Sequence, residues 1–151
     1  MSRLLVLYYS QTGNTQKMAE AVAEGAKGVQ GTKVELKYHL TPEELTDYDA
    51  IVAGDPTYHH DMTNGMKKLF EEVSVKDVSL EGKTGAAFGS YGWSGEAPKL
   101  LLEIMKEKFG MIIFEPPLLI KYTPDLAGLE ECRQLGRKIA EKLMGHAQDV
   151  K

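Results

Sequence analysis

The hydrophobic positions of this chain change period along its length, which predicts strands that alternate with helices. Residues 4–8 form a continuous apolar run, as expected for a strand that is covered on both faces. Residues 33–38 alternate instead between apolar and charged side chains, which indicates a half-exposed strand at a sheet edge. Further strands are predicted at residues 49–53, 84–89 and 111–114, the last resuming at 118–120 after two prolines.

Apolar residues spaced three and four apart predict helices between these strands. The helices cover residues 14–27, a segment around residues 66–73, residues 97–109, and a closing helix that begins near residues 123–125. A short helix is predicted to start at Thr41 and Pro42 with a capping box and to end before Tyr48. The buried stripe predicted for the closing helix consists of Leu129, Cys132, Leu135, Ile139 and Leu143.

Five strands interleaved with helices predict an α/β fold, a three-layer doubly wound sandwich with a five-stranded parallel sheet. Right-handed crossovers and an edge position for the second strand favour the strand order 2-1-3-4-5. Ligands of such sheets bind beyond the carboxyl ends of the strands, where strands 1 and 3 diverge. The loops after strands 1, 3 and 4 are therefore the candidate site. No repeat or linker interrupts the pattern, so residues 1–151 are expected to form a single domain.

Composition narrows the choice of partners. The formal net charge is −4 and no long block of like charge occurs, which argues against nucleic acid or an anionic membrane as partner. The single cysteine excludes an internal disulfide and a cysteine metal cluster. No membrane-spanning or signal-peptide pattern is present, so a soluble cytoplasmic protein is expected.

The loop after the first strand has the composition of a phosphate-binding loop. Residues 10–15 carry three hydroxyls, one glycine and one asparagine, with no charged side chain, and they run directly into a helix. The free backbone N–H groups and positive dipole end of a helix N-terminus favour an anion. An ordinary polar turn that caps the helix would have the same composition, so this loop alone leaves both interpretations open.

The loops after the third and fourth strands each place large aromatic residues among glycines and polar residues. Tyr58 is in the first and Trp93, the only tryptophan, is in the second. Aromatic residues in such loops commonly cover a ligand, so a flat ring held between the two loops is one interpretation. The other is that Tyr58 and Trp93 simply fill gaps over the strand ends.

These segments resemble those of a known family. Residues 10–15 are similar to the phosphate loop of flavodoxins, and residues 88–93 resemble the second flavin loop of short-chain flavodoxins and of the flavodoxin domain in flavodiiron proteins. The resemblance extends over the whole chain, which lacks the insertion in the fifth strand that marks long-chain members. It implies a low-potential one-electron carrier, not an enzyme, that binds FMN non-covalently.

The resemblance also implies roles for individual residues. Tyr58 matches the inner stacking residue and Trp93 the outer one, and Thr57 would lie near the ribityl chain or the phosphate. The backbone of Ser90, Tyr91 and Gly92 would contact the flavin edge and the ribityl chain. The complete candidate FMN-binding set is Ser10, Gln11, Thr12, Gly13, Asn14, Thr15, Pro56, Thr57, Tyr58, His59, His60, Ser90, Tyr91, Gly92, Trp93 and Gly95.

The carrier would dock transiently onto electron-donor and electron-acceptor proteins as a monomer.

Carboxylates near the flavin would lower its potential, since one carboxylate ~10 Å from an anion costs ~1–2 kcal/mol at an effective dielectric of 20. Asp55, Asp61 and Glu96 are the candidates.

Three alternatives compete with the carrier interpretation. An FMN-dependent NAD(P)H:quinone or flavin reductase of the same fold usually needs extra loops, for which this chain has no spare length. A phosphate-accepting receiver domain needs an acidic pair after the first strand, where Tyr9 and Ser10 stand instead. A metal at His59 and His60 is disfavoured because adjacent residues rarely chelate one ion, and no matching cluster exists elsewhere.

His59 generates the first testable prediction. Many flavodoxins have glycine at this position, so that the next peptide can turn toward the flavin. A residue with a Cβ adopts positive φ at a cost of ~1–2 kcal/mol relative to glycine. We therefore expect the half-reduced form to be less stabilised than with glycine, by ~40–90 mV, which brings the two one-electron potentials closer together. Anaerobic redox titration measures this separation, and a half-reduced form that accumulates almost completely would contradict the prediction.

Overall fold

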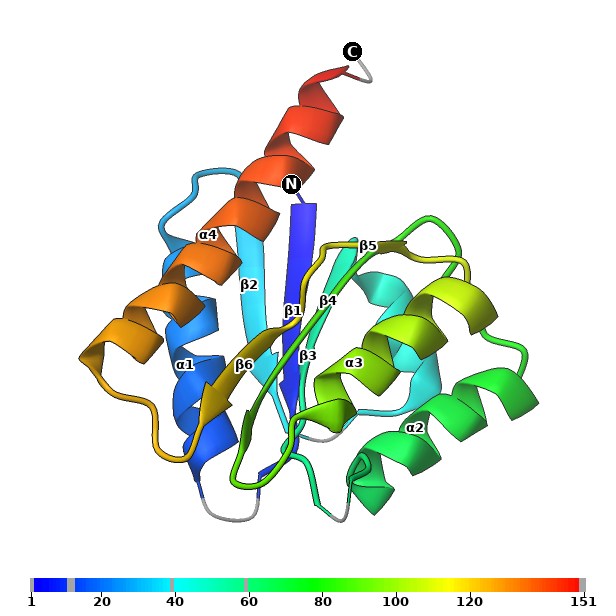
Figure 1. Cartoon of the computed structure of the whole chain (residues 1–151). Helices are drawn as coiled ribbons and strands as arrows, with labels where there is room; N and C mark the ends of the chain where they lie inside the picture. The colour runs from blue at the N-terminus through cyan, green and yellow to red at the C-terminus, as the bar shows by residue number, and fades with distance from the viewer. Residues whose placement is uncertain (1, 11–12, 39, 59, 150–151) are drawn as a thin grey trace.

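The computed structural model describes the backbone of residues 2–10, 13–38, 40–58 and 60–149 (Figure 1). The elements, in chain order, are β1 (Ser2–Tyr8), α1 (Asn14–Lys27), β2 (Thr32–Lys37), η1 (Pro42–Asp47), β3 (Ala50–Gly54), α2 (Asn64–Val75), β4 (Thr84–Tyr91), α3 (Glu96–Glu103), η2 (Ile104–Lys108), β5 (Ile112–Ile113), β6 (Leu118–Lys121) and α4 (Leu126–Asp149). Among the described residues, no helix is long and apolar enough to cross a membrane.

The strands form one sheet in the order β2-β1-β3-β4-β5, and every pairing is parallel. This confirms the predicted α/β fold and strand order. The fifth strand position is shared by two short strands, because β5 pairs with the start of β4 and β6 pairs with its end. Pro116 and Pro117 lie between them, and proline cannot donate a ladder hydrogen bond, which accounts for the interruption.

Helices cover both faces of the sheet, with α1 and α4 on one side and α2 and α3 on the other (Figure 1). Alternate residues of β1 therefore enter different cores. Leu5 and Leu7 pack with the α2 and α3 layer, whereas Leu4 and Val6 pack with the α1 and α4 layer. This explains why β1 reads as a continuous apolar run, whereas the edge strand β2 alternates.

The helix predictions hold, with two refinements. The short helix predicted after Thr41 is present with its capping-box start and ends before Tyr48, and it is a 3-10 helix. The helix predicted at residues 97–109 starts one residue earlier as α3, and its last part, η2, has π-helical hydrogen bonding. Neither change alters which face is buried, since Leu101 and Met105 both lie in the core. The second strand ends at Lys37, one residue before its predicted end.

Two glycines allow α1 and α4 to pack in direct backbone contact. A Cβ built on Gly25 would lie 1.9 Å from the carbonyl oxygen of Arg133. A Cβ built on Gly136 would lie 1.9 Å from the carbonyl oxygen of Val22. No real contact is that short, so any side chain at either position would push the two helices apart.

We expect Gly25→Ala to destabilise the protein by ~1–3 kcal/mol, because the cost of overpacking exceeds the gain of ~1 kcal/mol in helix propensity. Urea unfolding followed by circular dichroism measures the change. Gly145→Ala is the matched control, since Gly145 is also helical and its Cβ would meet no atom within 4 Å. The control should be neutral or stabilising, and equal effects of the two substitutions would contradict the prediction.

Candidate functional site

The loops that follow β1, β3 and β4 lie together at the carboxyl edge of the sheet. The hydroxyl oxygens of Thr15 and Ser90 are 3.0 Å apart, which joins the start of α1 to the end of β4. The backbone N–H of Thr57 donates to the carbonyl oxygen of Ser90 at 3.4 Å. Ser90 is therefore the residue that contacts both of the other loops, and it is buried.

The first loop leaves the N-terminus of α1 open to an anion. Gly13 is the N-cap residue, with φ of 90°, and no side chain caps the helix. The hydroxyl of Ser10 accepts the N–H of Gly13 at 3.0 Å and so shapes the turn. The first turn of α1, which starts with Asn14, carries no acidic residue. Gln11 and Thr12, two members of the candidate set, lie outside the described residues.

The second loop forms a narrow hairpin. Tyr58 and Asp61 exchange two backbone hydrogen bonds, at 3.1 and 3.0 Å. His59 lies outside the described residues, so its backbone conformation stays a prediction. His60 has φ of 64°, which is unusual for a residue with a Cβ. Pro56 is buried and Tyr58 is half-buried at the base of this hairpin.

His60 links the second loop to the third. Its Nδ1 is 3.1 Å from Oε1 of Glu96 and 3.0 Å from the hydroxyl of Ser94. A pocket of about 300 Å³ lies here, lined by Thr57, His60, Trp93 and Ser94. Trp93 is 90% exposed, so its ring stands at the rim of the pocket rather than filling a gap over the strand ends.

The third loop begins helix α3 with help from the second. Gly95 is the N-cap residue of α3, and the hydroxyl of Thr57 accepts the N–H of Ala97 at 3.0 Å. The carbonyl oxygen of Tyr91 accepts the N–H of Tyr122 at 2.7 Å, and Gly92 is exposed. The hydroxyl of Thr57 thus orients α3 at the same edge of the sheet where a ligand would bind.

The carboxylates near these loops are not free negative charges. Asp61 forms an ion pair with Lys67, which holds the pKa of Asp61 below its usual range. Hydrogen bonds from Ser94 and His60 likewise lower the pKa of Glu96. Asp55 differs, because burial raises its pKa to about 7. The lowered pKa values keep Asp61 and Glu96 ionised, with Asp61 beside the charged partner Lys67. The raised pKa of Asp55 instead weakens the negative charge of its carboxyl.

The role of Asp55 was missed at the level of sequence. Its carboxylate accepts hydrogen bonds from the N–H of Thr63 at 2.9 Å and from the hydroxyl of Thr63 at 2.6 Å. Asp55 has no exposed surface. The signal in the sequence is that an acidic residue directly follows the buried strand β3, and a threonine stands just before α2.

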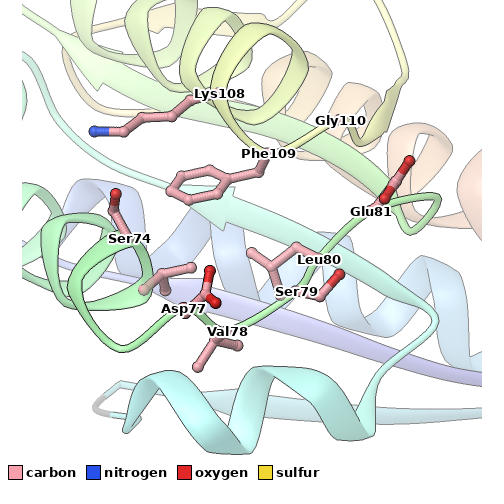
Figure 2. A pocket seen from close by; sticks show the side chains of 10 residues that line it. Ser74, Asp77, Val78, Ser79, Leu80, Glu81, Lys108, Phe109 and Gly110 are labelled. Atoms are coloured by element: carbon pink, nitrogen blue, oxygen red, sulfur yellow. The ribbon is translucent and has the colours of Figure 1, made fainter.

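A larger pocket of about 490 Å³ lies far from these loops. It is lined by the ends of α2 and η2 and by the segments that follow them, including Asp77, Glu81, Lys108 and Phe109 (Figure 2). These segments precede β4 and β5, so the pocket is at the opposite edge of the sheet. None of the candidate residues lines it. Among the described residues, no group of three His, Cys, Asp or Glu side chains is placed to hold a metal ion.

The raised pKa of Asp55 makes the stability of the cofactor-free protein depend on pH. The proton is held more tightly in the folded state than in the unfolded chain, so wild-type stability falls as pH rises from about 4 to about 7. Asparagine does not titrate. The free energy of unfolding of Asp55→Asn, measured relative to that of wild type, is therefore expected to be higher at pH 8 than at pH 4 by ~2–4 kcal/mol.

Urea unfolding of both proteins across this pH range measures the difference. Asp61→Asn is the control, because the pKa of Asp61 is lowered and its contribution to stability is lost on acidification instead. Parallel pH profiles for wild type and Asp55→Asn would contradict the prediction.

Comparison with known proteins agrees with this arrangement. The family model described as Flavodoxin matches residues 6–136. A flavodoxin from Aquifex aeolicus (strain VF5) is 35% identical over 161 residues, covering 93% of this chain and 86% of that protein. The type A flavoprotein fprA of Rhodobacter capsulatus is 37% identical over 151 residues, but this chain spans only 34% of its length.

The fold comparison points to the same family. A solved flavodoxin from the domain Archaea superposes with a TM-score of 0.87 and 40% identity, covering 94% of this chain and 99% of the other. The match to the family model spans most of the chain, and the Aquifex relative is matched over most of its own length. The chain therefore belongs to the flavodoxin family of FMN-binding electron-transfer proteins.

Proposed function

We propose that residues 1–151 form a single domain that holds FMN non-covalently and carries low-potential electrons, one at a time, between redox enzymes. The observation that carries the proposal is the meeting of three loops at one edge of the sheet. The second and third loops line a pocket of about 300 Å³, and the first leads into an uncapped helix N-terminus. FMN supplies the one-electron chemistry, and the protein supplies binding and electrostatics. The carrier works as a cytoplasmic monomer that docks transiently onto a donor and an acceptor protein.

The start of α1 fits the FMN phosphate. Its first N–H groups precede the first helical acceptor, and no side chain or acidic residue in the first turn competes for them. A Cβ built on Gly13 would meet no atom within 4 Å, so space is open beside these donors. Ser10, Thr12, Asn14 and Thr15 would add side-chain contacts, together with the backbone of Gln11 and Gly13.

The second and third loops fit the flavin ring and the ribityl chain. Tyr58 would cover the inner face of the ring and Trp93 the outer face. The hairpin bonds that hold the backbone of Tyr58 and the exposure of Trp93 at the pocket rim support these roles. Ser90, Tyr91 and Gly92 would contact the ring edge and the ribityl chain through their backbone. Because His60 bonds to Glu96 and Ser94, the two loops hold each other in place around the ring.

The function is tested by the absorption spectrum of the purified protein before and after stepwise anaerobic reduction. We expect flavin bands, release of FMN on denaturation, and reduction in two one-electron steps. A colourless protein that does not take up added FMN would contradict the proposal. Steady oxidation of NADPH or NADH by the FMN-loaded protein would favour a reductase instead.

Trp93→Ala is expected to weaken FMN binding about tenfold, because a stacked aromatic ring contributes on the order of 1.4 kcal/mol. Quenching of FMN fluorescence during titration of the cofactor-free protein measures the affinity. Leu126→Ala is the matched control, since Leu126 is 85% exposed but lies at the start of α4, outside the pocket. An equal loss of affinity in both variants would contradict the stacking role.

A further inference from the structure

Asp55 is the one ionisable residue among the buried polar residues of the described chain, which are Thr15, Asp55, Thr84 and Ser90. It directly follows β3, at the edge of the sheet where the cofactor loops begin. A buried carboxyl is costly unless it is hydrogen-bonded or neutral, so its presence calls for a structural or chemical reason.

The carboxyl of Asp55 connects the two ends of the second cofactor loop. It accepts both hydrogen bonds from Thr63, whose hydroxyl oxygen in turn accepts the N–H of Met66 in the first turn of α2. The seven residues between Asp55 and Thr63 include Tyr58 and His60. The Asp55–Thr63 pair therefore closes the loop that carries the inner stacking residue.

The backbone of Asp55 also contacts β4, close to the strand end that leads into the third loop. Its N–H donates to the carbonyl oxygen of Phe88 at 3.0 Å. A Cβ built on Gly89 would lie 2.1 Å from the carbonyl oxygen of Asp55, so only glycine fits there. Asp55 thus sits where the end of β3 packs against β4, just before the second loop, and it has no exposed surface.

The charged and titratable groups that face Asp55 do not neutralise it. Asp61, in the same loop, raises the pKa of Asp55, although Lys67 pairs with Asp61. Tyr9, after β1, and Tyr58 both have raised pKa values to which Asp55 contributes. The groups that favour the ionised form are the two Thr63 donors, and burial outweighs them. Asp55 is therefore close to half-ionised near neutral pH.

We propose that Asp55 is a positioning residue of the cofactor site whose proton affinity rises when the bound FMN becomes more negative by one charge, so that a proton from solvent binds to part of the Asp55 carboxyls that are still ionised at that pH. The proposal rests on the function proposed above. An external one-electron donor supplies the electron, water supplies the proton, and one O–H bond forms on the Asp55 carboxyl. On oxidation, the electron passes to the acceptor and the proton returns to water. Thr63 keeps an oxygen acceptor throughout, so the loop stays closed.

The test compares the midpoint potential of the second one-electron step in FMN-loaded wild type and Asp55→Asn across a pH series. Asparagine keeps an oxygen acceptor for Thr63 but cannot titrate. At about pH 5 the carboxyl is neutral in both redox states, so the two proteins should have similar potentials. At about pH 9 the Asp55 carboxyl is ionised in both redox states. A tenfold rise in its proton affinity on reduction then corresponds to a wild-type potential that is ~59 mV lower than that of the variant.

Matched variants separate this role from a merely structural one. Asp61→Asn removes a neighbouring carboxylate that is exposed and paired, so the pH dependence of the wild type should persist. Thr63→Ala removes the hydroxyl donor that favours ionisation of Asp55. The pH at which the slope of midpoint potential against pH changes should therefore be higher in this variant. This second variant also tests the proposal if Asp55→Asn does not fold.

The carboxyl can be followed directly as well. Carbon-13 NMR can titrate the Asp55 side chain in FMN-loaded protein, both oxidised and reduced with dithionite. The carboxyl should bind its proton at least tenfold more tightly in the reduced sample. A potential difference that does not vary with pH, or an unchanged NMR titration, would overturn the inference while leaving the carrier function intact. Failure of the protein to take up FMN would instead overturn the proposed function.

Discussion

Residues 4–7 of β1 and residues 50–53 of β3 have no exposed surface, because helices cover both faces of the sheet. Strands buried in this way have no place for polar chemistry along their length. Polar groups can reach a ligand only where the ladder ends, and in a parallel sheet the carboxyl ends of all strands meet at one edge. The positions of Ser10, Asp55 and Ser90 follow from this constraint, since each lies at or just beyond the end of its strand.

The same constraint decides the electrostatics of the site. Loop residues that lie over a buried sheet edge are partly removed from water, so each charge there needs a partner or a shifted pKa. Asp61 and Glu96 have partners in Lys67 and His60, whereas Asp55 has only the dipolar donors of Thr63. Among the described residues that line the pocket, none is a lysine or an arginine. A negative charge added there is poorly compensated, which favours a low potential.

Much of the fold could be predicted from local hydrophobic patterns in the sequence. The two hydrophobic periods predicted β1, the edge position of β2 and the stripe of α4, because each depends on which side chains share a face. The π-helical turn of η2 could not be predicted, since its residues keep an ordinary helical pattern. The loop composition identified the edge at which a ligand would bind. The bond between Thr15 and Ser90 joins residues 75 positions apart, and the burial of Asp55 depends on Gly89 of the neighbouring strand, so neither was visible in sequence.

The contacts of the second loop restrict where it can move. Asp55 and Thr63 join its ends, and the paired backbone bonds of Tyr58 and Asp61 hold its middle. Between those bonds, His60 is the described residue in the left-handed region. These contacts hold the backbone of Tyr58, the proposed stacking residue, in place. A carrier benefits from this restraint, because fast electron transfer requires that the surroundings of the cofactor reorganise little between redox states.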